Sequence, residues 1–290
     1  MNTWNAEGPP VLPPATLAGR MIGVLRLGTF MLLTVICLGI FVTGRYLRPL
    51  LGRWVTYHFL TARLWSRAGL WFLGLRHVVR GTPISGGALV ANHCSWADIL
   101  TLRAVRLMYF VSKAEVRDWP GVGLITIVTG TIFIERRRTQ AKQQEQILRE
   151  RMGADQVLTF FPEGTSSDGL RVLPFKSSLF SAFFLDHHGA DLAIQPVTIR
   201  YAPAPGSGLP ANLYGWWGDM GLGGHVLAVM SRSFGGTAEI TFHSPVKAAD
   251  FSDRKALATH CETVVRGGLI AGENTGPELS SRLDNGADSV

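Results

Sequence analysis

The chain has 290 residues, of which 47% are hydrophobic and 17% charged, and this charged fraction lies below the roughly 25% of ordinary soluble domains. Nine of its 28 basic residues, all arginines, lie between Gly8 and Ala97 with no acid among them. The other 19 face 21 acids, so the net charge of +7 comes from the N-terminal third. No nucleic-acid recognition motif accompanies this charge, so we expect the arginines to face lipid headgroups and exclude a nucleic-acid partner.

The N-terminal third has the pattern of a membrane anchor. Residues 1–17 are Pro-rich and are expected to be disordered. Leu27–Gly44 contains no charge over 18 residues, near the lower limit for crossing a bilayer, and Met21–Leu25 extends it if Arg26 snorkels. A signal peptide is the alternative, but no small-residue cleavage site follows the run. We predict a spanning or re-entrant helix, and the flanking arginines favour a cytoplasmic C-terminal side.

Arginines alternate with aromatic residues in the following stretch, Leu50–Leu75. Arginine and tryptophan on one amphipathic helix suit the bilayer interface. The alternative is a helix packed on the domain with solvated arginines. With the preceding helix, this stretch makes residues 18–80 the expected anchoring segment.

Residues 81–272 are expected to form the globular domain, and residues 273–290 a flexible tail. Apolar and β-branched runs predict strands at Ala88–Asn92, Met108–Ser112, Gly130–Ile134, Val157–Phe161, Ala193–Arg200 and Ala238–Phe242. Helical patterns fall at Trp96–Arg106, Thr139–Met152 and Phe175–His187. Strands that alternate with helices predict an α/β fold, in which a twisted sheet is flanked by helices on both faces.

A histidine and an aspartate follow the first predicted strand of this domain. His93 and Asp98 are five residues apart, so they do not share a face of one helix, and they meet only if the chain bends between them. A strand ending at Asn92, with Ser95 as N-cap of the next helix, supplies that bend. Asp98 then reaches back to His93, and the pair forms a general base for a hydroxyl proton. The alternative is that Ser95 and Asp98 form a capping box beside an ordinary loop histidine.

Two further strand ends carry polar residues. Phe161-Pro162-Glu163-Gly164-Thr165 follows one predicted strand and exposes backbone N–H groups and a carboxylate, although an ordinary turn explains the same residues. Arg136 follows another, where a guanidinium clamps phosphate or carboxylate; Arg137 and Arg138 are interpreted as solvated. The three scattered cysteines have neither a disulfide framework nor metal spacing, so we expect no metal and a reducing compartment.

Four blocks in order resemble the glycerolipid acyltransferase family, whose familiar member is the 1-acylglycerol-3-phosphate acyltransferase. They cover Leu89–Arg200, somewhat over a third of the chain. The blocks are Asn92-His93-(x4)-Asp98, Lys113-Ala114-Glu115 continuing to Ile134-Glu135-Arg136, Phe161-Pro162-Glu163-Gly164-Thr165, and Gln195-Pro196-Val197. Each block is weak alone, and the ordered set is specific.

The resemblance implies a glycerol-3-phosphate acyltransferase-like mixed sheet and a set of roles. His93 would deprotonate the acceptor hydroxyl, Asp98 would orient its imidazole, and Arg136 with Glu163 to Ser166 would contact the acceptor. The oxygen then attacks the thioester of acyl carrier protein or coenzyme A, without an acyl-enzyme and without a bound cofactor.

One position departs from the family pattern. The third block usually continues Gly-Thr-Arg, and the arginine is associated with acceptor phosphate, whereas this chain has Ser166. Relatives that acylate lyso-ornithine lipid use a phosphate-free acceptor, and Tyr214–Met220 also resembles that branch. We therefore expect a lysolipid O-acyltransferase that makes ornithine lipid, located at the inner membrane with its catalytic domain facing the cytoplasm. The alternatives are a 1-acylglycerol-3-phosphate acyltransferase making phosphatidic acid, a thioester or lipid hydrolase, and an inactive lipid-binding protein.

Overall fold

A computed structural model describes residues 4–5, 8–51, 57–119, 121–134, 156–184 and 192–274. The helices are α1 (Leu17–Leu51), α2 (Tyr57–Phe72), α3 (Ala97–Arg103), α4 (Val122–Val128), α7 (Leu222–Met230) and α8 (Arg254–Asn274). The strands are β1 (Leu75–Arg80), β2 (Gly87–Ala91), β3 (Tyr109–Lys113), β4 (Ile132–Ile134), β5 (Val157–Phe160), β6 (Ala193–Ala202), β7 (Gly236–Phe242) and β8 (Val246–Lys247). Short 3₁₀ helices are η2 (Ala114–Asp118), η4 (Ser177–Phe184) and η5 (Ala248–Asp250).

The strands form one mixed sheet in the order β1-β7-β6-β2-β5-β3-β4, with β8 paired to β6. The central strands β6, β2, β5 and β3 run parallel, and in register Leu89 of β2 lies opposite Thr159 of β5 and Gln195 of β6. β7 pairs antiparallel to β6 and parallel to β1. The sheet is therefore mixed, as expected, and the carboxyl ends of its central strands meet at one edge.

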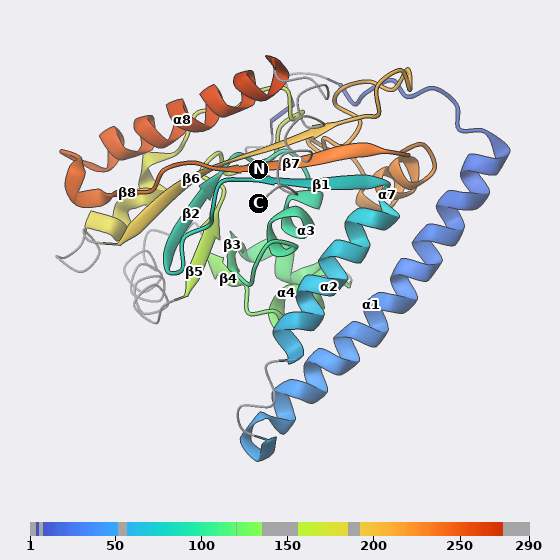
Figure 1. Ribbon diagram of the computed structural model, residues 1–290, viewed down its shortest axis with the longest axis horizontal. Coiled ribbons are helices and arrows are strands. Elements are labelled where there is room, and N and C mark those ends of the chain that lie inside the picture. The colour runs from blue at the N-terminus through green and yellow to red at the C-terminus, as the bar shows by residue number, and fades with distance from the viewer. Residues whose placement is uncertain are drawn as a thin grey trace, which may run out of the picture.

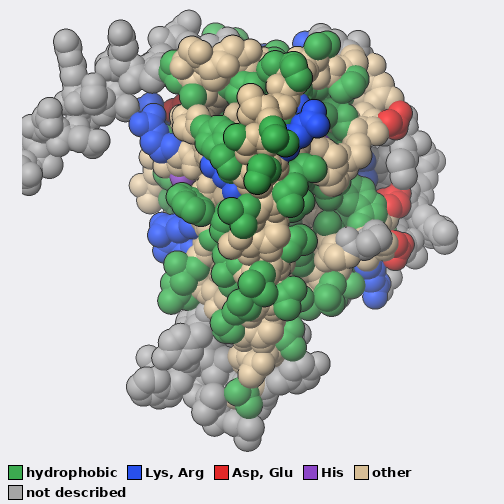
Figure 2. Space-filling view, turned by 90° about the vertical axis from the view of Figure 1, so that its right-hand side faces the viewer, with side chains coloured by type: hydrophobic (Ala, Val, Ile, Leu, Met, Phe, Trp, Pro, Cys, Tyr) green, Lys and Arg blue, Asp and Glu red, His purple; other side chains and the backbone are tan. Residues whose placement is uncertain are grey.

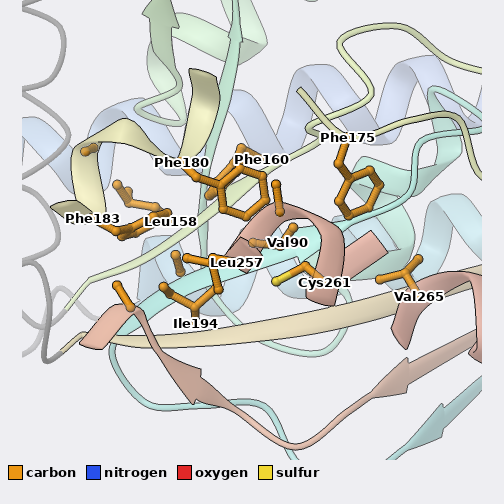
Figure 3. Close-up of a cluster of buried hydrophobic side chains, with 14 of the residues drawn as sticks. Val90, Leu158, Phe160, Phe175, Phe180, Phe183, Ile194, Leu257, Cys261 and Val265 are labelled. Atoms are coloured by element: carbon orange, nitrogen blue, oxygen red, sulfur yellow. The ribbon is translucent and has the colours of Figure 1, made fainter. Parts of the chain in front are cut away.

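Helices cover both faces of the sheet, with α8 on one side and α2, α3 and α4 on the other (Figure 1). The alternation of side chains along β2 divides the core accordingly. Ala88 and Val90 point into a cluster with α8 and η4, whereas Leu89 and Ala91 join a cluster with α3. Figure 3 shows the first cluster, where aromatic side chains of β5 and η4 meet Leu257 of α8. Burial on both faces explains why the central strands are continuously apolar.

Helix α1 has the properties of a membrane anchor. Its Leu17–Gly44 stretch is long and apolar enough to cross a membrane, with a mean hydropathy of 2.2, and only 6% of its most apolar window is buried. Exposed side chains such as Leu25 (70%), Leu32 (62%) and Val35 (67%) line the outer face of the helix. Figure 2 shows hydrophobic side chains running down this face of the molecule. A core helix would instead bury these side chains, so the exposure indicates contact with lipid.

The first turns of α1 are docked onto the end of α7. A Cβ at position 23 would lie 2.2 Å from Ser231 Oγ and 3.0 Å from Ser231 Cα, so only glycine allows this approach. Arg26 donates hydrogen bonds to the carbonyls of Met230 (3.2 Å) and Ser233 (2.9 Å). The extension of the apolar run to Met21 is expected only if Arg26 snorkels; the run does extend, and the Arg26 guanidinium instead caps the C-terminal end of α7.

Helix α2 lies between α1 and the sheet rather than only at a bilayer surface. The indole of Trp65 donates to Thr34 Oγ1 of α1 (2.8 Å), and Arg63 and Arg67 both donate from Nε to the carbonyl of Ala104 at the end of α3 (3.2 Å each). The arginines thus neutralise a helix C-terminus. The opposite side still exposes Trp71 (71%), so one face packs while another is free for lipid.

Several sequence-based boundaries change. The sheet begins at Leu75, before the expected domain start at residue 81, because β1 pairs with β7. The described part of the expected disordered start is ordered against the domain, where Arg232 donates from Nε to the carbonyl of Pro13 (2.8 Å). The helix expected at Phe175–His187 is instead the 3₁₀ helix η4. The expected helix at residues 139–152 lies outside the described residues.

The contact between α1 and α7 predicts a difference between two glycines of the same helix. Gly23→Ala should destabilise the protein by about 1–3 kcal/mol, because the methyl group overpacks against Ser231. Gly28→Ala is the matched control, since a Cβ there meets nothing within 4 Å and alanine favours the helix. Thermal unfolding in detergent measures both. Equal midpoints for the two variants would contradict the docked arrangement.

Candidate active site

The site lies where two parallel strands end. β2 ends at Ala91 and leads to His93, while the neighbouring β5 ends at Phe160 and leads to the turn from Phe161 to Thr165. Because the two strands run parallel in register, both segments emerge at the same edge of the sheet. The first and third blocks of the sequence are therefore brought together.

His93 and Asp98 are in direct contact. The distance from His93 Nδ1 to Asp98 Oδ2 is 2.7 Å, and the imidazole stacks on Phe161 with 4.2 Å between ring centroids. The Asp98 side chain is fully buried, whereas 22% of the His93 side chain is exposed. A carboxylate at Nδ1 selects the tautomer that carries its proton there. Nε2 is then the basic nitrogen, and the exposed part of the ring is accessible to a substrate hydroxyl.

The bend between the two residues is fixed by backbone donors. The N–H groups of Cys94 (2.9 Å) and Ser95 (3.0 Å) both donate to Asp98 Oδ2. Helix α3 begins at Ala97, after an N-cap at Trp96 that makes no side-chain cap bond, so the prediction of Ser95 as N-cap is one residue early. The Ser95 hydroxyl still accepts from the N–H of Ala97 (3.3 Å). Asp98 therefore binds the N–H groups of Cys94 and Ser95 in the loop before α3 as well as His93, so these backbone bonds and the His–Asp contact do not exclude each other.

The peptide of His93 is held on both sides by the turn after β5. Its N–H donates to Glu163 Oε1 at 2.7 Å, and its carbonyl accepts from the N–H of Ser167 at 2.9 Å. These bonds join residues that are 70 and 74 positions apart in the sequence. The third block thus sets the backbone position of the base.

Glu163 binds backbone groups on both sides, and its expected contact with the acceptor stays a prediction. Its second oxygen accepts the N–H of Leu173 (2.9 Å), and the residue is only 2% exposed. Both oxygens therefore bind backbone within the protein. Burial raises the pKa of Glu163 to about 8, although the N–H groups of His93 and Leu173 act in the opposite direction.

The structure describes three of the other four residues that were expected to contact the acceptor. Gly164 has φ +69°, a left-handed conformation that favours glycine, and a Cβ there would lie 2.5 Å from Nζ at the flexible end of Lys176. Thr165 is half-buried and its hydroxyl lies 3.5 Å from the N–H of Trp4, while Ser166 is 7% exposed. Arg136 lies outside the described residues. No cluster of three or more metal-ligating side chains occurs in the part of the chain that the structure describes.

Sequence reasoning missed three contributions to the site. Asn92 pairs both ends of its amide with the backbone of Ile199 (2.9 and 2.8 Å), which extends β2 against β6. Tyr201 donates from its hydroxyl to Asp98 Oδ1 at 2.9 Å. The N–H of Trp216 donates to the carbonyl of Cys94 at 2.8 Å, so the segment Tyr214–Met220 borders the site. Tyr201 is 103 residues from Asp98 in the sequence, and Trp216 is 122 residues from Cys94. No local spacing predicts contacts between residues so far apart.

Comparisons with known proteins agree with this geometry. Residues 77–200 match the family described as Acyltransferase. A lyso-ornithine lipid O-acyltransferase of Rhodobacter capsulatus is 44% identical over 92% of this chain and 96% of its own length. The chain belongs to the acyltransferase family. It is therefore an acyltransferase enzyme, and its apolar helix α1 indicates association with a membrane.

Other relatives of this acyltransferase carry two different names. A lyso-ornithine lipid O-acyltransferase of Brucella abortus is 37% identical over 72% of the chain and 79% of its own length. A 1-acyl-sn-glycerol-3-phosphate acyltransferase of Neisseria gonorrhoeae is 31% identical over 63% of this chain and 69% of its own length. The crystal structure of the 1-acyl-sn-glycerophosphate acyltransferase of Thermotoga maritima has a TM-score of 0.63 at 22% identity, covering 88% of this chain and 98% of that one. This likeness confirms the expected fold.

The environment of Glu163 predicts a dependence of stability on pH. Its folded-state pKa of about 8 lies above the value near 4.3 of an unfolded chain, so the native state keeps a proton that the unfolded state releases. Stability should therefore fall as pH rises from about 5 to about 8. Glu163→Gln cannot titrate, so its stability should lack this component. Unfolding midpoints across the range test the difference, and parallel curves for the two proteins would contradict it.

Proposed function

We propose that this acyltransferase is a lysolipid O-acyltransferase that transfers a fatty acyl group from a thioester to the hydroxyl of lyso-ornithine lipid. The contact between His93 and Asp98 carries the proposal, since it places a general base at the carboxyl end of the parallel central strands. The names of the relatives from Rhodobacter capsulatus and Brucella abortus support the acceptor.

In the proposed reaction, Nε2 of His93 takes the proton of the acceptor hydroxyl while Asp98 stabilises the resulting imidazolium. The acceptor oxygen forms a bond to the thioester carbonyl carbon and gives a tetrahedral oxyanion. The carbon–sulfur bond then breaks, and the thiolate takes the proton from His93. The acyl group passes directly to the acceptor, so no covalent acyl-enzyme is required.

The choice of acceptor rests on residues beside the base. Ser166 stands where a guanidinium would give a phosphate two charged N–H donors, and a serine hydroxyl gives neither charge nor bidentate geometry. A charge-assisted hydrogen bond contributes about 1.5–3 kcal/mol, so its loss favours an acceptor without phosphate. Lysophosphatidic acid is the second candidate, favoured by the name of the Neisseria gonorrhoeae relative and by Arg136 as a phosphate ligand.

The proposal extends to the donor and the membrane. Acyl carrier protein or coenzyme A would deliver the thioester, and no bound cofactor is needed for the chemistry above. With arginines on both sides of the uncharged stretch Leu27–Gly44 and three free cysteines, a catalytic domain on the cytoplasmic side of the inner membrane is the proposed arrangement.

The test is acyl transfer by membranes that contain the protein. His93→Ala should reduce transfer by at least about 10³-fold, because it removes the base and its hydrogen bond to the acceptor. His260→Ala on α8 is the control, since its ring contacts Phe251 rather than the site. Lyso-ornithine lipid and lysophosphatidic acid are offered in parallel with a labelled acyl thioester.

Transfer chiefly to lyso-ornithine lipid would support the proposal, and transfer chiefly to lysophosphatidic acid would replace the acceptor. Full activity of His93→Ala would contradict the role of His93 as the general base. Release of free fatty acid without an acceptor would indicate a hydrolase. Lipid binding without turnover would indicate an inactive lipid-binding protein.

A further inference from the structure

The two oxygens of the Asp98 carboxylate have different partners. Oδ2 accepts from His93 Nδ1 and from the N–H groups of Cys94 and Ser95. Oδ1 faces the hydroxyl of Tyr201 at 2.9 Å and the weaker donor Cys94 Sγ at 3.4 Å. One tyrosine hydroxyl is therefore the strong donor to the half of the carboxylate that His93 does not use.

Tyr201 comes from β6, which pairs with β2 on the side away from β5. Its hydroxyl also lies 2.8 Å from Thr101 Oγ1, three residues after Asp98 in α3. Thr101 has one hydroxyl proton, which goes either to Tyr201 or to the carbonyl of Ala97 (3.0 Å). When Thr101 donates to Tyr201, the Tyr201 proton is left for Asp98. Burial, together with the charge of Asp98, raises the pKa of Tyr201 well above its usual value, so the hydroxyl keeps its proton. It is thus a fixed donor to a fully buried carboxylate.

We propose that Tyr201 is a positioning residue for the transfer reaction, and that its hydroxyl locks Asp98 in the orientation that holds His93. This inference rests on the proposed function of the His93–Asp98 pair. It gives β6, the neighbour of β2 on the side opposite β5, a direct part in the site, in addition to the part of the turn after β5.

Loss of the Tyr201 hydroxyl has two consequences that differ from a loss of packing. Asp98 gains freedom to turn, so the imidazole is correctly oriented less often and kcat falls. A carboxylate with one donor fewer is also a stronger acceptor, so it holds a proton on His93 more tightly. The base is then neutral only at higher pH, and the rising acid limb of the pH–rate profile moves upward.

The other ionisable groups around the pair are unchanged by this substitution. They are Cys94 in the same loop, Glu163 and Asp168 after β5, Arg171 paired with Asp168 at 2.8 Å, Lys176 beside Gly164, and Arg266 of α8, whose charge acts on Glu163. Because each of them remains in both proteins, a shift of the acid limb reports on the contact between Tyr201 and Asp98.

The experiment compares Tyr201→Phe with Tyr214→Phe in the full-length protein in membranes. Tyr214 is a matched control, because its ring centroid lies 5.7 Å from that of Tyr201 and its hydroxyl bonds Ser233 Oγ at 2.5 Å instead of Asp98. Tyr201→Phe should lower kcat about tenfold with little change in the KM for the acceptor. Its acid limb should move to higher pH by about half a unit. Tyr214→Phe should lower the unfolding midpoint without moving that limb.

A second readout does not depend on any lysolipid. Diethyl pyrocarbonate modifies neutral imidazole, so the rate of His93 modification, followed by mass spectrometry against pH, should shift upward in Tyr201→Phe. If no lysolipid is acylated but this shift appears, the proposed function fails and the positioning role stands. Wild-type kcat and an unmoved modification profile in Tyr201→Phe would overturn the inference, even if its unfolding midpoint fell.

Discussion

The parallel pairing of β2 with β5 is the constraint on which the site depends. It brings the loop of His93 beside the turn of Glu163, and that turn then holds both the N–H and the carbonyl of the His93 peptide. The third block is thus a backbone clamp as well as a candidate acceptor contact. A base positioned through its own peptide is oriented before substrate arrives, which is the preorganisation that transfer chemistry requires.

Three carboxylates are buried in this small region, and each is accommodated differently. Asp98 is surrounded by four close donors, including an imidazole and a phenol. Asp168 pairs with Arg171 at 2.8 Å. Glu163 has two backbone donors but no ion pair among the described residues, and its pKa is raised to about 8. Burying a charge without a partner is costly. These arrangements keep the Asp98 carboxylate next to His93 without burying three uncompensated negative charges.

The sequence was sufficient for the central strands and for the His–Asp pair, because both depend on local patterns and strand order. It missed α8, although Leu257, Cys261, Val265 and Leu269 recur every four residues and Asp253 caps the start. It also mistook η4 for an α-helix, since three residues per turn bring Phe180 and Phe183 to the same buried side. Tyr201 was out of reach, because its contact with Asp98 arises only when β6 joins the sheet.

The anchor of this enzyme is also part of its fold. Helix α1 buries Phe30 against Trp65, fits closely over Ser231 and caps α7 through Arg26. Removal of the anchor is the usual route to a soluble version of an anchored enzyme. Here it would remove the α1 side chains that cover the hydrophobic cluster containing Leu70 and Leu73. The shortened chain would no longer need lipid, but it would expose a new apolar surface and would tend to aggregate. Purification has to keep α1 and supply a detergent or bilayer for its outer face.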